Sequence, residues 1–274
     1  MAESHTLTDL VRQLEARLAR LGPIALAFSG GLDSRFLAHT ALNAGADIHA
    51  VHIAGPHVPG EEEAFCRAWA AERGLPLTVA ECDPLSIPEV AAGREDRCYY
   101  CKRAIFTAIR RAAPDRIICD GTNASDLSAY RPGLRALSEL AVISLMAELG
   151  IDKAAIHEMA TLTGMDRPDQ AARPCLLTRF NYGLSPDKET LARIDAAENA
   201  VAAVLARHAA EPPPDYRLRV EAPGAYLLQV ALPELPDSLR HALETILAEH
   251  GFAHARILHG PAISGYFDRA AKLA

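Results

Sequence analysis

The chain has 274 residues, and 28 Lys and Arg against 35 Asp and Glu give it a net charge of −7. This acidic balance argues against a nucleic-acid partner, because surfaces that bind nucleic acids are rich in Lys and Arg. Half of the residues are apolar, which suits a globular protein with a sizeable core. No apolar run is long enough to span a membrane, so we expect a cytoplasmic protein with no membrane partner. The six cysteines should then be reduced, which favours metal binding or chemistry over disulfides.

Short apolar runs alternate with helical patterns over the first part of the chain. The expected strands are residues 24–28, 47–53, 77–80 and 116–119. The expected helices are residues 34–43, 61–73, 102–112, 138–149 and 153–163. Such alternation is typical of a parallel sheet with helices on both faces, in which ligands bind beyond the carboxyl ends of the strands. We therefore predict a doubly wound α/β domain over residues 1–184.

The rest of the chain, residues 185–274, is predicted to form a smaller α+β domain. Its expected elements are a helix over 187–208, strands over 216–221 and 226–232, a helix over 235–250 and a strand over 255–258. Arg217 and Arg219 are two residues apart on the first of these strands, so they project from the same face. Two adjacent guanidinium groups need an anionic partner, either an acidic side chain such as Glu221 or a ligand phosphate.

The turn after the first expected strand carries the strongest motif. Residues 29–34 read Ser-Gly-Gly-Leu-Asp-Ser between a buried strand and a helix. Glycines let the backbone curl, and the serine hydroxyls can donate to one anion together with the free amides of the helix start. The turn lacks the Gly-Lys-Ser/Thr ending of a Walker loop and the spaced glycines of a dinucleotide fingerprint. It resembles the PP-loop of ATP pyrophosphatases, which split ATP between the α and β phosphates. An ordinary tight turn is the alternative.

A second motif lies at the start of another expected helix, where residues 98–102 read Cys-Tyr-Tyr-Cys-Lys. Cysteines three apart at a helix start face the same side, and the free amides there favour the thiolate. This pair alone fits a redox dithiol, half a zinc site, part of an iron–sulfur site or two ordinary thiols. Three more polar segments follow: Asp-Gly-Thr-Asn at 120–123, Tyr-Arg-Pro-Gly at 130–133 and Cys-Leu-Leu-Thr-Arg at 175–179.

These five segments, in this order, resemble those of the LarE family of sulfur transferases, and the resemblance extends over nearly the whole chain. It implies a PP-loop ATP pyrophosphatase domain that uses ATP and Mg²⁺. The expected reaction adenylylates a carboxylate of pyridinium-3,5-biscarboxylic acid mononucleotide and converts it to a thiocarboxylate, a step in the biosynthesis of the nickel-pincer nucleotide cofactor. The resemblance also implies a homo-oligomer.

The resemblance assigns roles to individual residues. Asp33, Lys102 and Cys175 are expected to be catalytic, with Lys102 neutralising charge on the α-phosphate. The residues expected to bind ATP and its Mg²⁺ are Ser29, Gly30, Gly31, Asp33, Ser34, Asp120, Asn123 and Arg131. Those expected to clamp the phosphate of the mononucleotide substrate are Thr178, Arg179, Arg217 and Arg219.

Members of this family take sulfur from two kinds of source. Some surrender the sulfur of a single cysteine, which matches Cys175 here. Others hold a 4Fe-4S cluster through three thiolates and bind a loose sulfide at the fourth iron. Because Cys98, Cys101 and Cys175 are all present, the resemblance favours a cluster fed by a sulfide donor. A structural zinc site is the main alternative, but a closed one needs a fourth protein ligand that the sequence does not place nearby.

Two other functions stay open. A tRNA thiolation enzyme also joins a PP-loop to cysteine or cluster chemistry, but it would need a basic RNA surface. A non-enzymatic adenine-nucleotide sensor or cluster carrier would bind ATP without releasing pyrophosphate. The remaining cysteines, Cys66, Cys82 and Cys119, are expected to serve packing.

Overall fold

The computed structural model describes residues 6–128, 131–170, 173–208, 214–260, 263 and 265–271. The chain divides into two compact units. The first comprises Met1–Cys82 and Cys98–Arg173, and the second comprises Asp83–Arg97 and Pro174–Ala274. Residues 83–97 and 174–184 therefore pack with the C-terminal part of the chain. The predicted domain boundary after residue 184 stays a prediction, because a compact unit need not fold on its own.

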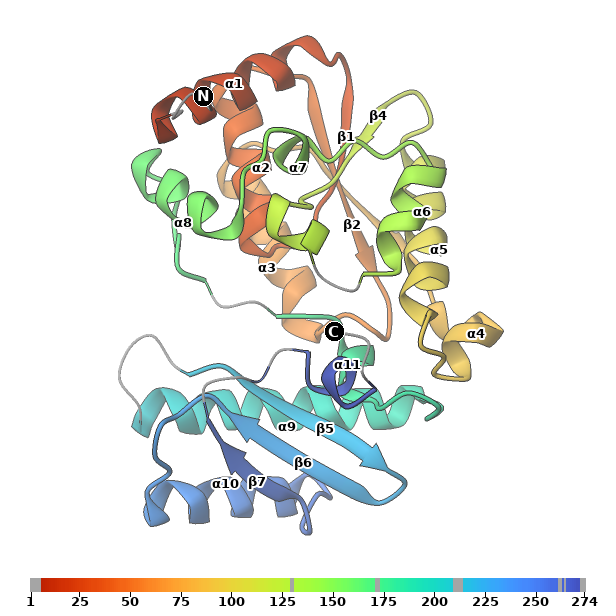
Figure 1. Cartoon of the computed structure of the whole chain (residues 1–274), viewed down its shortest axis with the longest axis vertical. Helices are drawn as coiled ribbons and strands as arrows, with labels where there is room; N and C mark the ends of the chain where they lie inside the picture. The colour runs from red at the N-terminus through yellow and green to blue at the C-terminus, as the bar shows by residue number, and fades with distance from the viewer. Residues whose placement is uncertain are drawn as a thin grey trace. The chain divides into compact units, whose positions relative to one another are not determined.

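A four-stranded parallel sheet forms the centre of the first unit (Figure 1). Its strands are β1 (Ile24–Ala27), β2 (Ile48–Ala54), β3 (Leu77–Glu81) and β4 (Ile117–Cys119). They lie in the order β3-β2-β1-β4, and every neighbouring pair is parallel. The chain thus places β2 and β3 on one side of β1 and β4 on the other. This arrangement confirms the predicted α/β fold and makes the carboxyl end of β1 the switch point at which ligands bind in such sheets.

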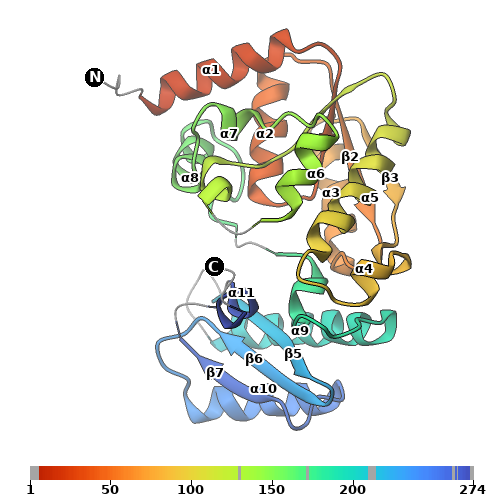
Figure 2. The same ribbon diagram turned by 45° about the vertical axis from the view of Figure 1, so that its right-hand side comes forward.

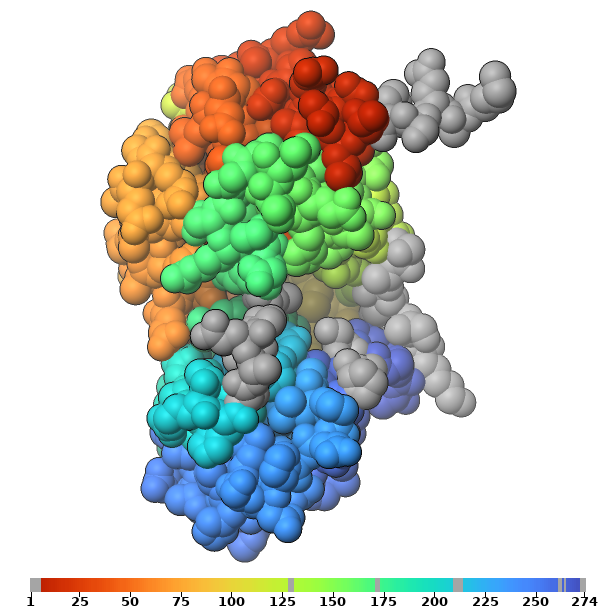
Figure 3. Space-filling model, turned by 90° about the vertical axis from the view of Figure 1, so that its left-hand side faces the viewer, coloured from red at the N-terminus to blue at the C-terminus, as the bar shows by residue number. Residues whose placement is uncertain are grey.

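Helices cover both faces of this sheet (Figures 1 and 2). On one face lie α1 (Leu7–Arg20), α2 (Leu32–Asn43), α3 (Gly60–Glu72), α7 (Leu145–Glu148) and α8 (Lys153–Leu162). On the other lie α5 (Arg97–Ala112) and α6 (Gly133–Glu139). Side chains alternate along a strand, so Ile24 and Leu26 enter the first core while Ala25 enters the second. In Figure 3, α1 and α8 form much of the surface over the first face.

The predicted helix over residues 138–149 is wrong. Instead α6 ends at Glu139, α7 begins at Leu145, and Ala141 between them has a φ of 51°. Ile143 pairs in parallel with Cys119, and its amide donates to the Ile118 carbonyl at 2.9 Å. The apolar residues that suggested a helix are used to extend the sheet beside β4, so tertiary pairing overrides the local pattern.

Asp166 ties the connection after α8 to α2 and α3. The Arg35 side chain is fully buried, and its Nη1 donates to the Asp166 carbonyl at 2.9 Å and to Oδ2 at 3.3 Å. Trp69 Nε1 and Arg73 Nη2 both donate to Oδ1, at 3.0 and 2.7 Å. Burial lowers the pKa of Arg35, and the Asp166 carboxylate acts in the opposite direction. One carboxylate therefore keeps a buried arginine charged and holds three segments together.

The second unit contains a three-stranded sheet. Its main elements are α9 (Lys188–His208), β5 (Tyr216–Ala222), β6 (Ala225–Val230), α10 (Asp237–Glu249) and β7 (Arg256–His259). The strands lie in the order β5-β6-β7, with β6 antiparallel to β5 and parallel to β7. The order α-β-β-α-β matches the prediction. The free edge of β5 is extended by a parallel bridge between Val220 and Phe180.

Short helical turns complete the chain. They are η1 (Pro84–Ser86), α4 (Pro88–Ala91), η2 (Ala124–Ser128), η3 (Leu176–Arg179) and α11 (Tyr266–Ala270). The segment with η1 and α4 joins the second unit through Arg97, whose Nη2 donates to the Phe180 carbonyl at 2.7 Å. Across the described residues, no helix combines the length and apolar character needed to cross a membrane.

Candidate functional site

The turn from Ser29 to Ser34 lies at the carboxyl end of β1, as predicted. The two serine Oγ atoms are 3.2 Å apart, and Ser34 Oγ donates to the Gly31 carbonyl at 3.0 Å. Gly31 precedes α2 and offers no capping side chain, so the amides at the positive end of the helix dipole face the turn. Two hydroxyls and a helix start thus converge on one place, an arrangement that suits a phosphate group.

Gly30 gives this turn its shape. Its φ is +78°, and a Cβ added there would lie 2.7 Å from Cys66 Sγ and 3.2 Å from Glu62 Oε2. The backbone of the turn therefore rests directly on α3, where no side chain has room. Burial raises the pKa of Cys66 to about 12, so this thiol stays neutral and serves packing. Cys119 is likewise buried in the core, as expected.

Asp33 is paired with Lys153, a residue that the sequence analysis missed. Lys153 Nζ lies 2.5 Å from Asp33 Oδ1, and Asn123 Nδ2 donates to Oδ2 at 3.4 Å. Lys153 is the first residue of α8 and follows the capping residue Asp152. That cap predicts a helix start but gives no sign of a partner 120 residues away. Lys102, the expected cation, has its Nζ 6.0 Å from the centre of the Phe106 ring.

The loop after β4 supplies the other predicted residues. Asp120 is buried and accepts hydrogen bonds from Ser144 Oγ at 2.6 Å and Thr122 Oγ1 at 2.5 Å, so it stabilises the loop itself. Asn123 of the same loop reaches Asp33. Arg131 is half-exposed and forms an ion pair with Asp126 at 2.7 Å. The structure thus brings Asn123 to the turn, while Asp120 bonds within its loop and to Ser144 at the start of α7, and Arg131 pairs with Asp126.

The three cysteines of the predicted cluster belong to different units. Cys98 and Cys101 lie in the first turns of α5, where Cys98 is exposed and Cys101 is buried. Cys175 is half-buried and precedes η3 in the second unit. No three His, Cys, Asp or Glu side chains are grouped as metal ligands within the part of the chain that is described. The three thiols are chemically suited to an iron–sulfur cluster, and the 4Fe-4S site stays a prediction.

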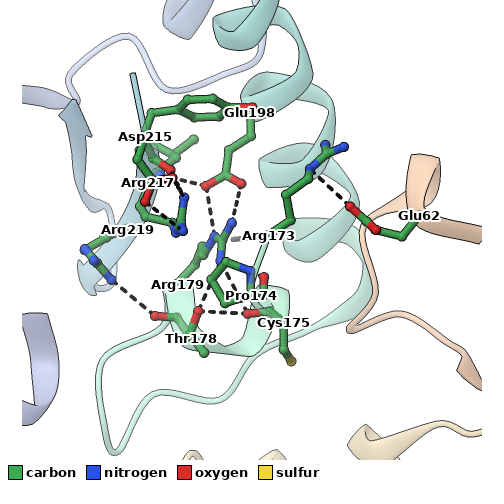
Figure 4. A network of polar contacts seen from close by, with 12 residues as sticks. Glu62, Arg173, Pro174, Cys175, Thr178, Arg179, Glu198, Asp215, Arg217 and Arg219 are labelled. Atoms are coloured by element: carbon green, nitrogen blue, oxygen red, sulfur yellow. Dashed lines mark hydrogen bonds and ion pairs between the residues drawn. The ribbon is translucent and has the colours of Figure 1, made fainter. Parts of the chain in front are cut away.

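Three of the buried arginines of the second unit, Arg179, Arg217 and Arg219, lie on neighbouring segments (Figure 4). Arg179 donates through Nε and Nη2 to the two carboxylate oxygens of Glu198, at 2.9 and 2.6 Å. Arg217 is paired in the same two-pronged way with Asp215, at 2.5 and 3.2 Å. Each of these arginines is therefore neutralised by its own carboxylate. Glu198 was not predicted, because nothing local marks it among the acidic residues of α9.

Arg219 differs from the other two. It donates to neutral oxygens, those of the Gln229 side chain and of the Ile263 and Thr178 carbonyls, and forms no carboxylate ion pair among the described residues. Burial, with smaller contributions from the Arg179 and Arg217 charges, lowers its pKa to about 10. An anion beside Arg219 would relieve this effect. Glu221, the acid suggested by the sequence, is hydrogen-bonded to Arg256 and Tyr266 instead.

The two glycines of the turn should respond differently to substitution. Gly30→Ala is expected to lower the free energy of unfolding by about 1–3 kcal/mol, because alanine is strained at positive φ and its Cβ would meet Cys66. Gly31→Ala is the matched control, with an expected loss below about 1 kcal/mol. Gly31 has a φ of −69°, and an added Cβ would be in ordinary contact with Ser29 Oγ at 3.5 Å. Urea unfolding measures both values, and equal losses would contradict this account of Gly30.

The chain is similar to several proteins of known sequence, although no protein-family model matches it. An uncharacterised protein of Synechocystis is 31% identical over 196 residues, which cover 70% of this chain and 73% of the relative. An uncharacterised protein of Methanocaldococcus jannaschii is 31% identical over 180 residues, 64% of this chain and 68% of the relative. Pyridinium-3,5-bisthiocarboxylic acid mononucleotide synthase of Lactiplantibacillus plantarum is 30% identical over 199 residues, 70% of this chain and 72% of the relative. At this identity and coverage, the chain belongs to the LarE family of which that synthase is a member.

Proposed function

We propose that this protein is an ATP-dependent sulfur transferase that makes a thiocarboxylate in the biosynthesis of the nickel-pincer cofactor. The observation that carries the proposal is the similarity to the Lactiplantibacillus plantarum synthase, whose name states its product. The proposed substrate is pyridinium-3,5-biscarboxylic acid mononucleotide. The turn at Ser29–Ser34 supports the proposal, because its hydroxyls and helix start suit the phosphates of ATP.

The chemistry requires activation of the carboxylate, because oxide is too poor a leaving group for direct exchange by sulfur. In the proposed first step, a carboxylate oxygen attacks the α-phosphorus of ATP and pyrophosphate leaves. In the second, a sulfur nucleophile attacks the carbonyl carbon and the C–O bond to AMP breaks. Ser29 and Ser34 would bind the departing pyrophosphate, and the Asp33 carboxylate would bind the accompanying Mg²⁺. These residues would act by orientation and charge stabilisation.

Lys153 is proposed as a cation for the phosphates in addition to Lys102. Its ion pair with Asp33 is half-exposed, with 38% and 27% of the two side chains accessible. Pairs of this kind contribute at most about 1 kcal/mol. If Lys153 changed its partner from Asp33 to a phosphate oxygen, little free energy would be lost. The Asp33 carboxylate would then be available to Mg²⁺. Asn123, which also contacts Asp33, would hold the carboxylate in place during the exchange.

Arg219 is proposed as the main anchor for the phosphate of the mononucleotide. Of Arg179, Arg217 and Arg219, it is the one that pairs with neutral groups only among the described residues, so a dianionic phosphate would find uncompensated charge there. Arg217 lies on the same face of β5 and would contribute at longer range, because Asp215 neutralises it. The lowered pKa of Arg219 supports this choice, since a bound anion would restore its ordinary value.

Sulfur delivery is proposed to involve all three cysteines of the motif set. Cys98, Cys101 and Cys175 would hold a 4Fe-4S cluster, which would supply a sulfide at its open iron for attack on the acyl-adenylate. The alternative is that Cys175 gives up its own sulfur. That route allows one turnover per chain, because the cysteine is consumed. The two routes therefore differ in the number of products that each chain can make.

The proposed reaction predicts that pyrophosphate release depends on the carboxylate substrate. Purified protein with ATP and Mg²⁺ is expected to release pyrophosphate and AMP only when the biscarboxylate mononucleotide is added. Asp33→Asn should reduce the rate at least about 100-fold, because the metal loses a charged ligand. A chain that binds ATP but never releases pyrophosphate would instead be a nucleotide sensor. Strongly salt-dependent tRNA binding would point to the RNA thiolation alternative.

Cys98→Ala separates the two routes of sulfur delivery. In protein reconstituted anaerobically with iron and sulfide, the variant is expected to lose multiple turnover and most of its bound iron. Its pyrophosphate release should be unchanged, because Cys98 itself is not among the residues proposed for adenylylation and Lys102 on the same helix is left in place. Cys82→Ala is the matched control, since Cys82 is a half-buried packing residue, and it should keep both iron and turnover. Unimpaired multiple turnover by Cys98→Ala would rule out the cluster route.

Arg219→Met should weaken binding of the mononucleotide about 10- to 100-fold, because a hydrogen bond to a charged group contributes about 1.5–3 kcal/mol. The KM for ATP should be unchanged. Binding by the wild-type protein should also weaken as the pH rises through about 10, where Arg219 loses its proton. Arg256→Met is the control, because Arg256 is an exposed arginine paired with Glu221. Equal losses in the two variants, measured by calorimetry, would remove Arg219 from the phosphate site.

A further inference from the structure

Cys175 is held by a tight set of hydrogen bonds to its backbone. Its carbonyl accepts from the Thr178 amide at 3.0 Å and from Thr178 Oγ1 at 2.8 Å. Arg179 Nη1 donates to the preceding carbonyl, that of Pro174, at 2.9 Å, and approaches the Cys175 carbonyl at 3.4 Å. The Cys175 sulfur points away from the guanidinium (Figure 4). Arg179 therefore acts on the backbone that carries the cysteine.

Glu198 orients Arg179 for this task. The two side chains are only 3% and 7% exposed, and both carboxylate oxygens of Glu198 accept from the guanidinium. Because a guanidinium is planar, a two-pronged bond to one edge also fixes the direction of the remaining Nη1 donors. Those donors point at Pro174 and Cys175. The carboxylate thus determines where Arg179 can hold the turn.

Glu198 is held in place by regular secondary structure. It lies within α9, a helix of 21 residues, and its Oε1 also accepts from the Leu218 amide of β5 at 2.8 Å. One buried carboxylate therefore links the helix, the edge of the sheet and the cysteine turn. A buried polar network in which every member has its partners rigidifies the groups that it joins.

We propose that Glu198 is a positioning residue for Cys175, acting through Arg179 on the backbone at residues 174–175. In this role Arg179, which the family resemblance assigns to the substrate phosphate, holds the turn that carries Cys175. Only the consequence for sulfur transfer rests on the proposed function. The positioning itself concerns the thiol and is measurable without substrate or cluster.

Glu198→Gln isolates the contact to Arg179. The amide oxygen of glutamine can still accept from the Leu218 amide and from Arg179 Nε, whereas its NH₂ group cannot accept from Arg179 Nη2, so the two-pronged pair is lost. Arg179→Lys is the second variant, because a single ammonium cannot bond Glu198 and the Pro174 carbonyl in the same geometry. Thr178→Val removes the hydroxyl bond to Cys175 and leaves Glu198 untouched. Asp215→Asn is the matched control, since it weakens the neighbouring Arg217 pair and leaves both Arg179 and Glu198 unchanged.

The test is the rate at which iodoacetamide alkylates Cys175 in the full chain, followed by peptide mass spectrometry. Glu198→Gln and Arg179→Lys should each raise this rate about tenfold, because the released turn exposes a half-buried thiol. The double variant should show no further increase in the alkylation rate, because both substitutions disrupt the same link between Glu198 and Arg179. The alkylation rates of Cys98 and Cys101 are measured in the same sample and should equal those of the wild-type protein. Asp215→Asn should leave the Cys175 rate unchanged.

An unchanged Cys175 rate in both variants would overturn the inference, as would fully additive effects in the double variant. An equal increase of the Cys175 alkylation rate in Asp215→Asn would also overturn it, because the faster alkylation would then come from a general loosening of the second unit. If Glu198→Gln does not fold by circular dichroism, Arg179→Lys and Thr178→Val decide the question. Thiocarboxylate formation by the wild-type protein is measured separately. Its absence, with altered Cys175 rates in the variants, would reject the proposed function and leave the positioning role standing.

Discussion

The close approach of the Gly30 backbone to Cys66 is the constraint on which the first unit depends. The central strand β1 ends there, and α2 must begin within a few residues while α3 packs against the turn. Only a residue without a side chain permits that packing at a φ of +78°. The same turn brings Ser29 and Ser34 together and places Asp33 in the first turn of α2. The packing of the sheet and the shape of the proposed anion site therefore depend on the same glycine.

Both units contain a buried arginine that is paired with a carboxylate. Asp166 pairs with Arg35 and Arg73 in the first, and Glu198 pairs with Arg179 in the second. Removal of one partner from a buried pair costs about 3–5 kcal/mol, because the other charge is left without compensation. Such arginines already have their charge compensated within the fold. Of Arg179, Arg217 and Arg219, it is Arg219 that pairs with neutral groups among the described residues, and for this reason it is the proposed partner of the ligand phosphate.

The sequence predicted the features that depend on local pattern. The buried strands, the turn at Ser29–Ser34 and the common face of Arg217 and Arg219 all follow from hydrophobic periodicity and turn chemistry. The partners of these groups did not follow. Lys153 lies 120 residues from Asp33, and Glu198 lies 19 residues from Arg179, so each pairing exists only once the chain has folded. The helix expected over 138–149 failed for the same reason, because pairing with β4 decides its conformation.

The two ion pairs nearest the proposed chemistry differ in burial, and this difference matches what each step requires. Adenylylation needs groups that can change partners as ATP and Mg²⁺ arrive, and the half-exposed pair of Lys153 and Asp33 can be exchanged at little cost. The proposed sulfur transfer needs a cysteine whose backbone stays in place, and the buried pair of Arg179 and Glu198, which holds that backbone, is costly to break. The arrangement therefore assigns exchangeable charge to the proposed nucleotide site and fixed charge to the turn that carries Cys175. A variant that made the first pair buried, or the second exposed, would be expected to impair one step and spare the other.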